Sequence, residues 1–148
     1  MKVLAKNRRA RFEYEILERV VAGLSLTGSE VKSVREGRVN LQDGHVAFEA
    51  GEAYLVGVHI SPYSHAGYAN HDPLRRRKLL LHRREIHRLQ GKVAEKGLAL
   101  VPLALGVEGN WIKVELALGR GKKLHDKRET IRRRELDREA EAAVKNRR

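Results

Sequence analysis

Glycines and lysines near the end of the chain give the first pattern that could carry chemistry, because a glycine-rich loop followed by lysine can cradle a phosphate. The segment is Gly119-Arg120-Gly121-Lys122-Lys123. A nucleotide-binding loop of this kind needs glycine at position 116 and serine or threonine at position 123, where this chain has Leu116 and Lys123. The pattern therefore does not predict a nucleotide site.

Histidines and carboxylates are the other candidates for chemistry. The chain has seven histidines, but His82 and His87 are five residues apart, and no pair has the spacing of a helical zinc motif. Asp43 and His45 could form part of a hydrolytic site, yet no nucleophile with a local signature accompanies them. The chain has no cysteine, which excludes disulfides and thiolate metal sites. We therefore expect no enzyme, no metal and no cofactor.

The charge balance favours a nucleic-acid partner. Lysine and arginine outnumber aspartate and glutamate 31 to 19, which gives a formal charge of +12 and a pI near 10.4. Such a field attracts polyanions, and each neutralised phosphate releases counterions. Charge can also serve solubility alone, but an excess of this size favours nucleic acid. Since no segment reaches the roughly 20 apolar residues of a membrane span or resembles a signal peptide, we expect a cytoplasmic protein without a membrane partner.

The elements that must position these residues are mainly strands. Phe12, Tyr14 and Ile16 alternate with charged residues, which predicts a half-buried strand. Apolar runs predict further strands over 46–48, 53–60, 98–105 and 111–118, with turns at 50–52 and 108–110. In the last strand the even positions 112–118 are apolar, so Lys113 is expected to project from the opposite face.

Two helices interrupt the strands. Thr27 and Glu30 have capping-box spacing, and the helix that they predict ends at Gly37. A second amphipathic helix is predicted over 82–96, ending at Gly97. The resulting fold class is mainly β: a small antiparallel barrel like the oligonucleotide/oligosaccharide-binding (OB) fold, with two or three flanking helices. The number of strands alone does not determine its topology.

A long loop is predicted over 61–78, where no period is visible. It carries Tyr63, His65, Tyr68 and His71 before the basic run Arg75-Arg76-Arg77-Lys78. Aromatic planes stack on bases and guanidinium groups pair with phosphates, so the loop suits RNA. A solvated surface loop explains this segment equally well.

A basic tail is expected to follow the barrel. Residues 1–118 carry a net charge of +6 (19 basic, 13 acidic), and residues 119–148 carry another +6 (12 basic, 6 acidic). We therefore divide the chain into a body, 1–118, and a tail, 119–148. The tail is rich in helix formers but has little apolar surface to bury, so we expect it to be mostly disordered alone and helical when bound to a polyanion.

Five segments in order and in register resemble one known family. They are residues 7–11 (NRRAR), 26–33 (LTGSEVKS), 59–63 (HISPY), 71–82 (HDPLRRRKLLLH) and 121–128 (GKKLHDKR). Together they resemble small protein B, the SsrA-binding protein family of bacteria, over essentially the whole chain. The resemblance implies an OB barrel that binds the tRNA-like domain of transfer-messenger RNA. It also implies delivery of that RNA to stalled ribosomes for rescue by trans-translation, without catalysis by the protein.

The same resemblance implies the partners and their sites. The partners are transfer-messenger RNA, the 70S ribosome with its 16S rRNA decoding centre and empty mRNA channel, and elongation factor Tu in the delivery complex. The tail would enter the decoding centre and fold as a helix in the channel. The body residues expected to bind RNA are Arg8, Arg9, Arg11, Arg75, Arg76, Arg77, Lys78 and Lys113. The tail residues expected to bind the ribosome are Arg120, Gly121, Lys122, Lys123, His125, Asp126, Lys127, Arg128, Arg132, Arg133 and Arg134.

Some positions allow two interpretations. Leu80 matches a family position tied to RNA binding, but we expect it to support the surface rather than contact RNA. Glu30 is either a helix cap or a surface contact, and the spacing favours the cap. Phe12 and Val21 depart from the family pattern, so contacts at those two positions are not transferred. The alternative function is a general RNA-binding or ribosome-associated barrel without specificity for transfer-messenger RNA.

Overall fold

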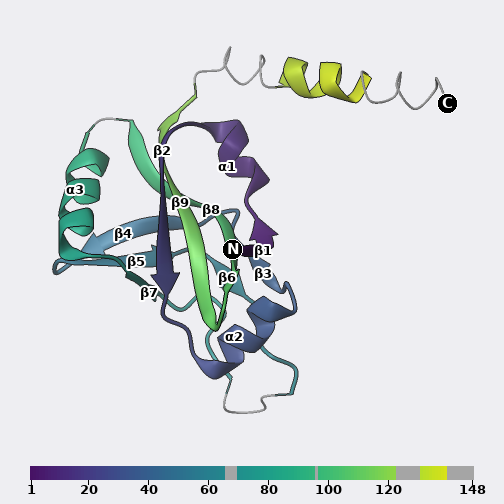
Figure 1. Cartoon of the computed structure of the whole chain (residues 1–148), viewed down its shortest axis with the longest axis vertical. Helices are drawn as coiled ribbons and strands as arrows, with labels where there is room; N and C mark the ends of the chain where they lie inside the picture. Colours follow the sequence, from purple (N-terminus) through teal and green to yellow (C-terminus); the bar gives the residue numbers. More distant parts are fainter. Residues whose placement is uncertain (66–69, 96, 123–130, 140–148) are drawn as a thin grey trace.

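The computed structural model describes residues 1–65, 70–95, 97–122 and 131–139. Seven strands form one antiparallel sheet in the order β1-β8-β9-β2-β7-β5-β4, and β3 pairs with β6. The sheet curls so that the Gly44 turn before β4 packs against Pro102 of β8, which closes a small barrel (Figure 1). The expected fold class is confirmed. The strands are β1 (Lys2–Lys6), β2 (Tyr14–Leu24), β3 (Val39–Asn40), β4 (His45–Glu49), β5 (Glu52–Val56), β6 (His59–Ile60), β7 (Arg77–Leu80), β8 (Leu98–Glu108) and β9 (Trp111–Gly121).

The longest hairpin, β8–β9, was predicted correctly. Its turn holds Gly109 at φ +60°, in the left-handed region that favours glycine. The even positions of β9 from Ile112 to Leu118 are buried, whereas Lys113 lies on the outward face and is half-buried. The β4–β5 hairpin also turns where predicted, at Ala50 and Gly51. Strand β9 continues to Gly121, three residues past the expected end of the body.

The first predicted strand is wrong at its start. Residues Arg8–Glu13 form a short helix, α1, so Phe12 is helical and the strand begins at Tyr14. The reason is Asn7, which is buried and caps the helix through its side-chain oxygen, 3.1 Å from the Ala10 nitrogen. The Asn7 amide also donates to the carbonyl oxygens of Leu41 and Pro102 at 3.1 and 2.9 Å. These long-range bonds decide the local structure, and a periodicity argument does not include them.

The strand predicted over 53–60 is divided by a glycine. Gly57 has φ +76°, and a Cβ there would lie 2.5 Å from the carbonyl oxygen of Asp43. The backbone therefore turns between β5 and β6, and the two strands join different sheets. The loop predicted over 61–78 is shorter than expected, because Arg77 and Lys78 belong to β7.

The two predicted helices are present. Helix α2 (Gly28–Arg35) lies beside β6, and helix α3 (Arg83–Val93) covers one side of the barrel through the buried residues Ile86 and Leu89 (Figure 1). Residues 131–139 are also helical, with all nine side chains exposed. Among the described residues, no helix is long and apolar enough to cross a membrane.

Candidate nucleic-acid interface

One row of residues crosses the outward face of five neighbouring strands. In the register of the sheet, Gly23 of β2 pairs with Leu80 of β7 on one side and with Lys113 of β9 on the other. Lys113 in turn pairs with Gly106 of β8, which pairs with Val3 of β1. Directly paired residues of antiparallel strands project to the same side of a sheet. The row therefore places Lys113 between two glycines.

Large apolar side chains surround Lys113 on this face. Val21 and Trp111 lie two residues from Gly23 and Lys113 on their strands, so they project to the same side. Trp111 is 67% exposed, Val21 53%, and Leu80 47%. A cluster of exposed apolar groups on a highly charged protein indicates a binding surface. We call this surface the outer platform; its members are Val3, Val21, Gly23, Leu80, Trp111 and Lys113.

Neighbouring groups fill the space above the two glycines beside the lysine: Leu80 above Gly23, and the start of the chain above Gly106. A Cβ at Gly23 would lie 3.2 Å from the end of the Leu80 side chain, so Leu80 occupies space that a larger residue would need. Lys113 Nζ lies 3.0 Å from Glu108 at the end of the hairpin, and this hydrogen bond lowers the pKa of Glu108. An exposed pair of this kind contributes little stability. A phosphate can therefore replace Glu108 as the partner of Lys113 at small cost.

A second basic region, on β7 and the loop before it, is built differently. Glu30 of α2 is fully buried and accepts hydrogen bonds from Arg77 Nε at 2.6 Å and from Arg75 at 2.6 Å. It also accepts one from the Thr27 nitrogen at 2.8 Å, which confirms the helix-cap interpretation. Burial opposes ionisation of Glu30, but the hydrogen bonds from Arg75, Thr27 and Arg77 outweigh it and lower its pKa to about 2. We call Glu30 and Arg77, which are buried, together with the partly exposed Arg75, the buried charge cluster.

The buried charge cluster changes the roles expected for the basic run 75–78. Arg77 is completely buried and also donates to the Val58 carbonyl oxygen at 2.7 Å, so it cannot reach RNA in this fold. Strand alternation is the physical reason, since odd residues of β7 face inward. Arg76 is exposed, bonds Glu49 at 2.6 Å and lies 4.7 Å over the Tyr54 ring. Lys78 is also exposed, beside Glu52 at 3.6 Å.

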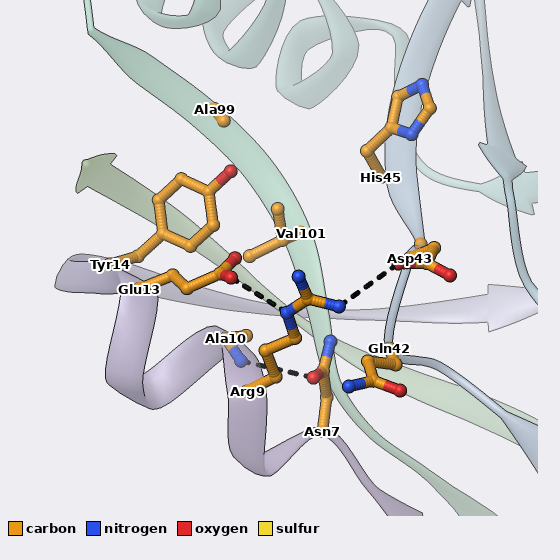
Figure 2. Close-up of a pocket in the computed structure, with 11 residues that line it drawn as sticks. Asn7, Arg9, Ala10, Glu13, Tyr14, Gln42, Asp43, His45, Ala99 and Val101 are labelled. Atoms are coloured by element: carbon orange, nitrogen blue, oxygen red, sulfur yellow. Dashed lines mark hydrogen bonds and ion pairs between the residues drawn. The ribbon is translucent and has the colours of Figure 1, made fainter. Parts of the chain in front are cut away.

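Three further arginines lie on α1, which packs against β2 and β8. Arg8 and Arg11 are exposed, and the Arg11 carbonyl oxygen accepts from Lys122 Nζ at 3.2 Å. Arg9 bonds Glu13 at 2.7 Å and lies 3.5 Å from Asp43, which precedes β4. Figure 2 shows the Arg9 guanidinium between these two carboxylates, at a pocket between α1, β4 and β8.

The tail residues divide into three groups. Arg120 and Gly121 belong to β9, and the Lys122 nitrogen donates to the Glu13 carbonyl oxygen at 2.9 Å, so the start of the tail is joined to the barrel. Lys123, His125, Asp126, Lys127 and Arg128 lie outside the described residues. Arg132, Arg133 and Arg134 are exposed on the helix over 131–139, and Arg134 lies 5.8 Å over the Phe12 ring.

Sequence reasoning did not select two prominent residues of the outer platform. Val21 was set aside because it departs from the family pattern, and Trp111 was treated only as the start of a strand. One signal was available for Trp111: it has the same strand parity as Lys113, which was expected to project outward. Leu80, which was expected to support the surface rather than contact RNA, is one of its exposed members.

The fold and this surface define a small basic β-barrel protein with exposed apolar and cationic groups suited to RNA. The family model described as SmpB protein matches residues 4–146. SsrA-binding proteins of Synechococcus elongatus and Nostoc punctiforme are 58% and 56% identical over 146 residues, 98% of this chain and 95% and 94% of those proteins. The chain belongs to the SmpB family, a family of RNA-binding proteins.

A solved structure supports the same assignment. A chain in the structure described as "tmRNA-SmpB: a journey to the center of the bacterial ribosome" superposes with a TM-score of 0.71 at 50% identity. The match covers 87% of this chain and 94% of that chain.

Proposed function

We propose that this protein binds the tRNA-like domain of transfer-messenger RNA through its body and delivers that RNA to stalled ribosomes for rescue by trans-translation. The outer platform is the observation that carries the proposal. It presents Trp111, Leu80 and Val21 around Lys113 on a chain with a formal charge of +12. The apolar and aromatic groups suit unpaired bases, and the lysine suits a phosphate.

In this proposal the body uses exposed cations beyond the outer platform. Lys78 lies on β7, the strand that carries Leu80, and Arg76 lies directly before that strand. Both side chains are exposed, and each forms an ion pair with one carboxylate. Arg8 and Arg11 are exposed on α1. Surface ion pairs such as these exchange readily for phosphate contacts, because they contribute little on their own. Arg75 and Arg77 instead hold Glu30, so we assign them a structural role.

The tail, in this proposal, is the part that recognises the ribosome. The tail would enter the 16S rRNA decoding centre and the mRNA channel. The channel is open to the tail only when no mRNA occupies it. The exposed arginines of the helix over 131–139 support this role, because that helix has little apolar surface to bury against the barrel. The tail signature from Lys123 to Arg128 is assigned the contact with the decoding centre on family resemblance alone.

The division between body and tail has a direct test. Strand β9 ends at Gly121 and Lys122 is bonded to α1, so truncation after Lys122 leaves every strand of the barrel complete. The truncated protein should bind transfer-messenger RNA with unchanged affinity but fail to support tagging of nascent chains on stalled ribosomes. Loss of RNA binding with the barrel still folded would contradict this division of labour.

We further propose that the protein itself performs no catalysis, acts in the cytoplasm and travels to the ribosome with elongation factor Tu. The experiment for specificity compares binding of the full chain to transfer-messenger RNA and to bulk tRNA at about 150 mM salt, where screening suppresses weak contacts. Strong preference for transfer-messenger RNA is expected. Equal, salt-sensitive binding to both would replace the proposal with a general RNA-binding barrel.

A further inference from the structure

A pocket lies between α1, the turn before β4 and β8, away from the residues assigned to the outer platform. Its volume is about 370 Å³, within the range of small-ligand sites. Ala10 and Val101 are almost completely buried and form an apolar floor, and the Tyr14 ring stands at one side (Figure 2). The rim is polar and comes from α1 and from the segment around β4. Its polar members are Asn7, Arg9, Glu13, Gln42, Asp43 and His45.

The Arg9 guanidinium is held in place across this pocket. Its Nε bonds Glu13 within α1 at 2.7 Å, and another nitrogen lies 3.5 Å from Asp43, 34 positions further along the chain. The two carboxylates therefore orient the guanidinium plane across the pocket. A planar, preset guanidinium is a surface on which a flat ring can stack, and lysine does not offer such a plane.

The charged residues that line the pocket disfavour an anionic occupant. Glu13 and Asp43 contribute two negative charges beside the single positive charge of Arg9, and the hydrogen bond that Arg9 donates to Glu13 raises the pKa of Arg9. A phosphate entering this pocket would meet both carboxylates, whereas a neutral flat ring would meet an apolar floor, an aromatic ring and a guanidinium. The carboxylates and the Gln42 amide supply acceptors and donors for the edge of such a ring.

We propose that this pocket receives one unpaired base of the bound RNA, with the base ring against Tyr14 and Arg9 and its polar edge toward Glu13 and Asp43. The inference rests on the proposed function, because it requires an RNA ligand. It gives Arg9, which the family resemblance implies as an RNA-binding residue, a stacking role. It also gives the protein a second RNA contact, beside the point where Lys122 joins α1 and the tail begins.

The first test fills the pocket. Ala99 of β8 lines it and is half-buried, so Ala99→Leu places a larger side chain in the space assigned to the base. Ala47→Leu is the matched control, because Ala47 is a half-buried strand alanine that does not line the pocket. The affinity of the full chain for transfer-messenger RNA should fall about tenfold for Ala99→Leu, since stacking on one base contributes on that order, and should not change for Ala47→Leu.

Chemical probing of the RNA identifies the base. Reagents that modify the Watson–Crick edges of unpaired bases should show one base that the wild-type protein protects and that becomes reactive again with Ala99→Leu. Protection by the wild type that Ala99→Leu leaves unchanged, together with equal affinity, would overturn the inference. If neither protein binds the RNA above the level of bulk tRNA, the proposed function itself fails, so the two failures are distinguishable.

A second variant tests the pocket without placing a larger side chain in it. Arg9 is about half-exposed, and Arg9→Lys keeps the positive charge while removing the guanidinium plane. Stacking predicts that Arg9→Lys loses protection of the same base and weakens RNA binding several-fold, at equal melting temperature. Arg84→Lys, at an exposed arginine of α3 outside both the pocket and the outer platform, should have no effect. Full function of Arg9→Lys would mean that Arg9 acts only through its charge, which would contradict the proposed pocket.

Discussion

The outer platform and the buried charge cluster both contain basic residues that matched the family pattern, yet the fold uses them in opposite ways. Lys113 of the platform is one-third exposed and paired with one exposed partner at the end of a hairpin. Arg77 of the cluster is fully buried, and its guanidinium bonds a buried carboxylate and a carbonyl oxygen. A basic residue in an RNA-binding protein can thus serve the ligand or the fold. Strand parity and burial separate these roles, and residue type does not.

The largest expected effect comes from breaking the buried charge cluster. Arg77→Met leaves Glu30 buried with one partner fewer, and loss of one member of a buried pair costs about 3–5 kcal/mol of unfolding free energy. Chemical denaturation measures this change. Arg76→Met is the matched control on the neighbouring exposed residue and should change stability by less than about 0.5 kcal/mol. Equal stabilities of the two variants would show that Arg77 is not a structural residue.

A slightly smaller effect is expected from acid. The pKa of Glu30 is about 2 in the fold against an ordinary value of 4.5, so the folded state favours the ionised carboxylate. Its contribution is fully present above about pH 4.5 and is lost as the pH falls toward 2, amounting to about 3 kcal/mol. Unfolding free energy measured from pH 6 to pH 2 should fall through this window in the wild type. Glu30→Gln should fall less steeply there, and parallel curves for the two proteins would refute the assignment.

Removing the aromatic ring of the outer platform should affect RNA rather than stability. Trp111 is 67% exposed, so Trp111→Leu is expected to leave the melting temperature within a few degrees of the wild type. Affinity for transfer-messenger RNA should fall by about 1–3 kcal/mol, the contribution of stacking on one base. Leu136→Ala, at an exposed apolar residue of the tail helix, is the control and should leave body binding unchanged. If Trp111→Leu bound RNA with wild-type affinity, the Trp111 ring would not be part of the RNA interface.

The smallest effect is expected at the lysine of the platform. Lys113→Ala removes one phosphate contact and one exposed ion pair, so stability should be nearly unchanged and affinity should fall several-fold. The dependence of log affinity on log salt should become shallower by about one unit of slope. A large fall in melting temperature would instead assign Lys113 to the fold, like Arg77.

Much of this architecture could be predicted from local pattern. The β8–β9 and β4–β5 hairpins, the Glu30 cap and the helix with Ile86 and Leu89 all follow from periodicity and turn residues within about ten positions. The predictions that were wrong concern elements whose structure depends on contacts between distant segments. Asn7 caps α1 through Ala10, and its bonds to Leu41 and Pro102, neither of which is visible in a short window, hold it in the capping position.

The candidate sites show the same limit. Strand alternation predicted correctly that Lys113 projects outward, but it could not show that Val21, Leu80 and Trp111 surround it, because these residues come from three strands. Charge and family resemblance also could not distinguish the buried Arg77 from the exposed Arg76. Arg77 begins strand β7, but it was expected to lie in a loop. The pairing of Arg9 with Asp43, which defines the pocket beside α1, likewise requires the folded chain.

The most direct test of the central claim, that the outer platform faces the RNA, uses the chain's single tryptophan. Trp111 is its only indole, so intrinsic indole fluorescence reports on this surface alone. Titration with transfer-messenger RNA at about 150 mM salt should quench the emission and shield Trp111 from acrylamide, in parallel with binding measured independently. Saturated binding with unchanged emission and unchanged acrylamide access would show that the RNA binds elsewhere and would contradict the account.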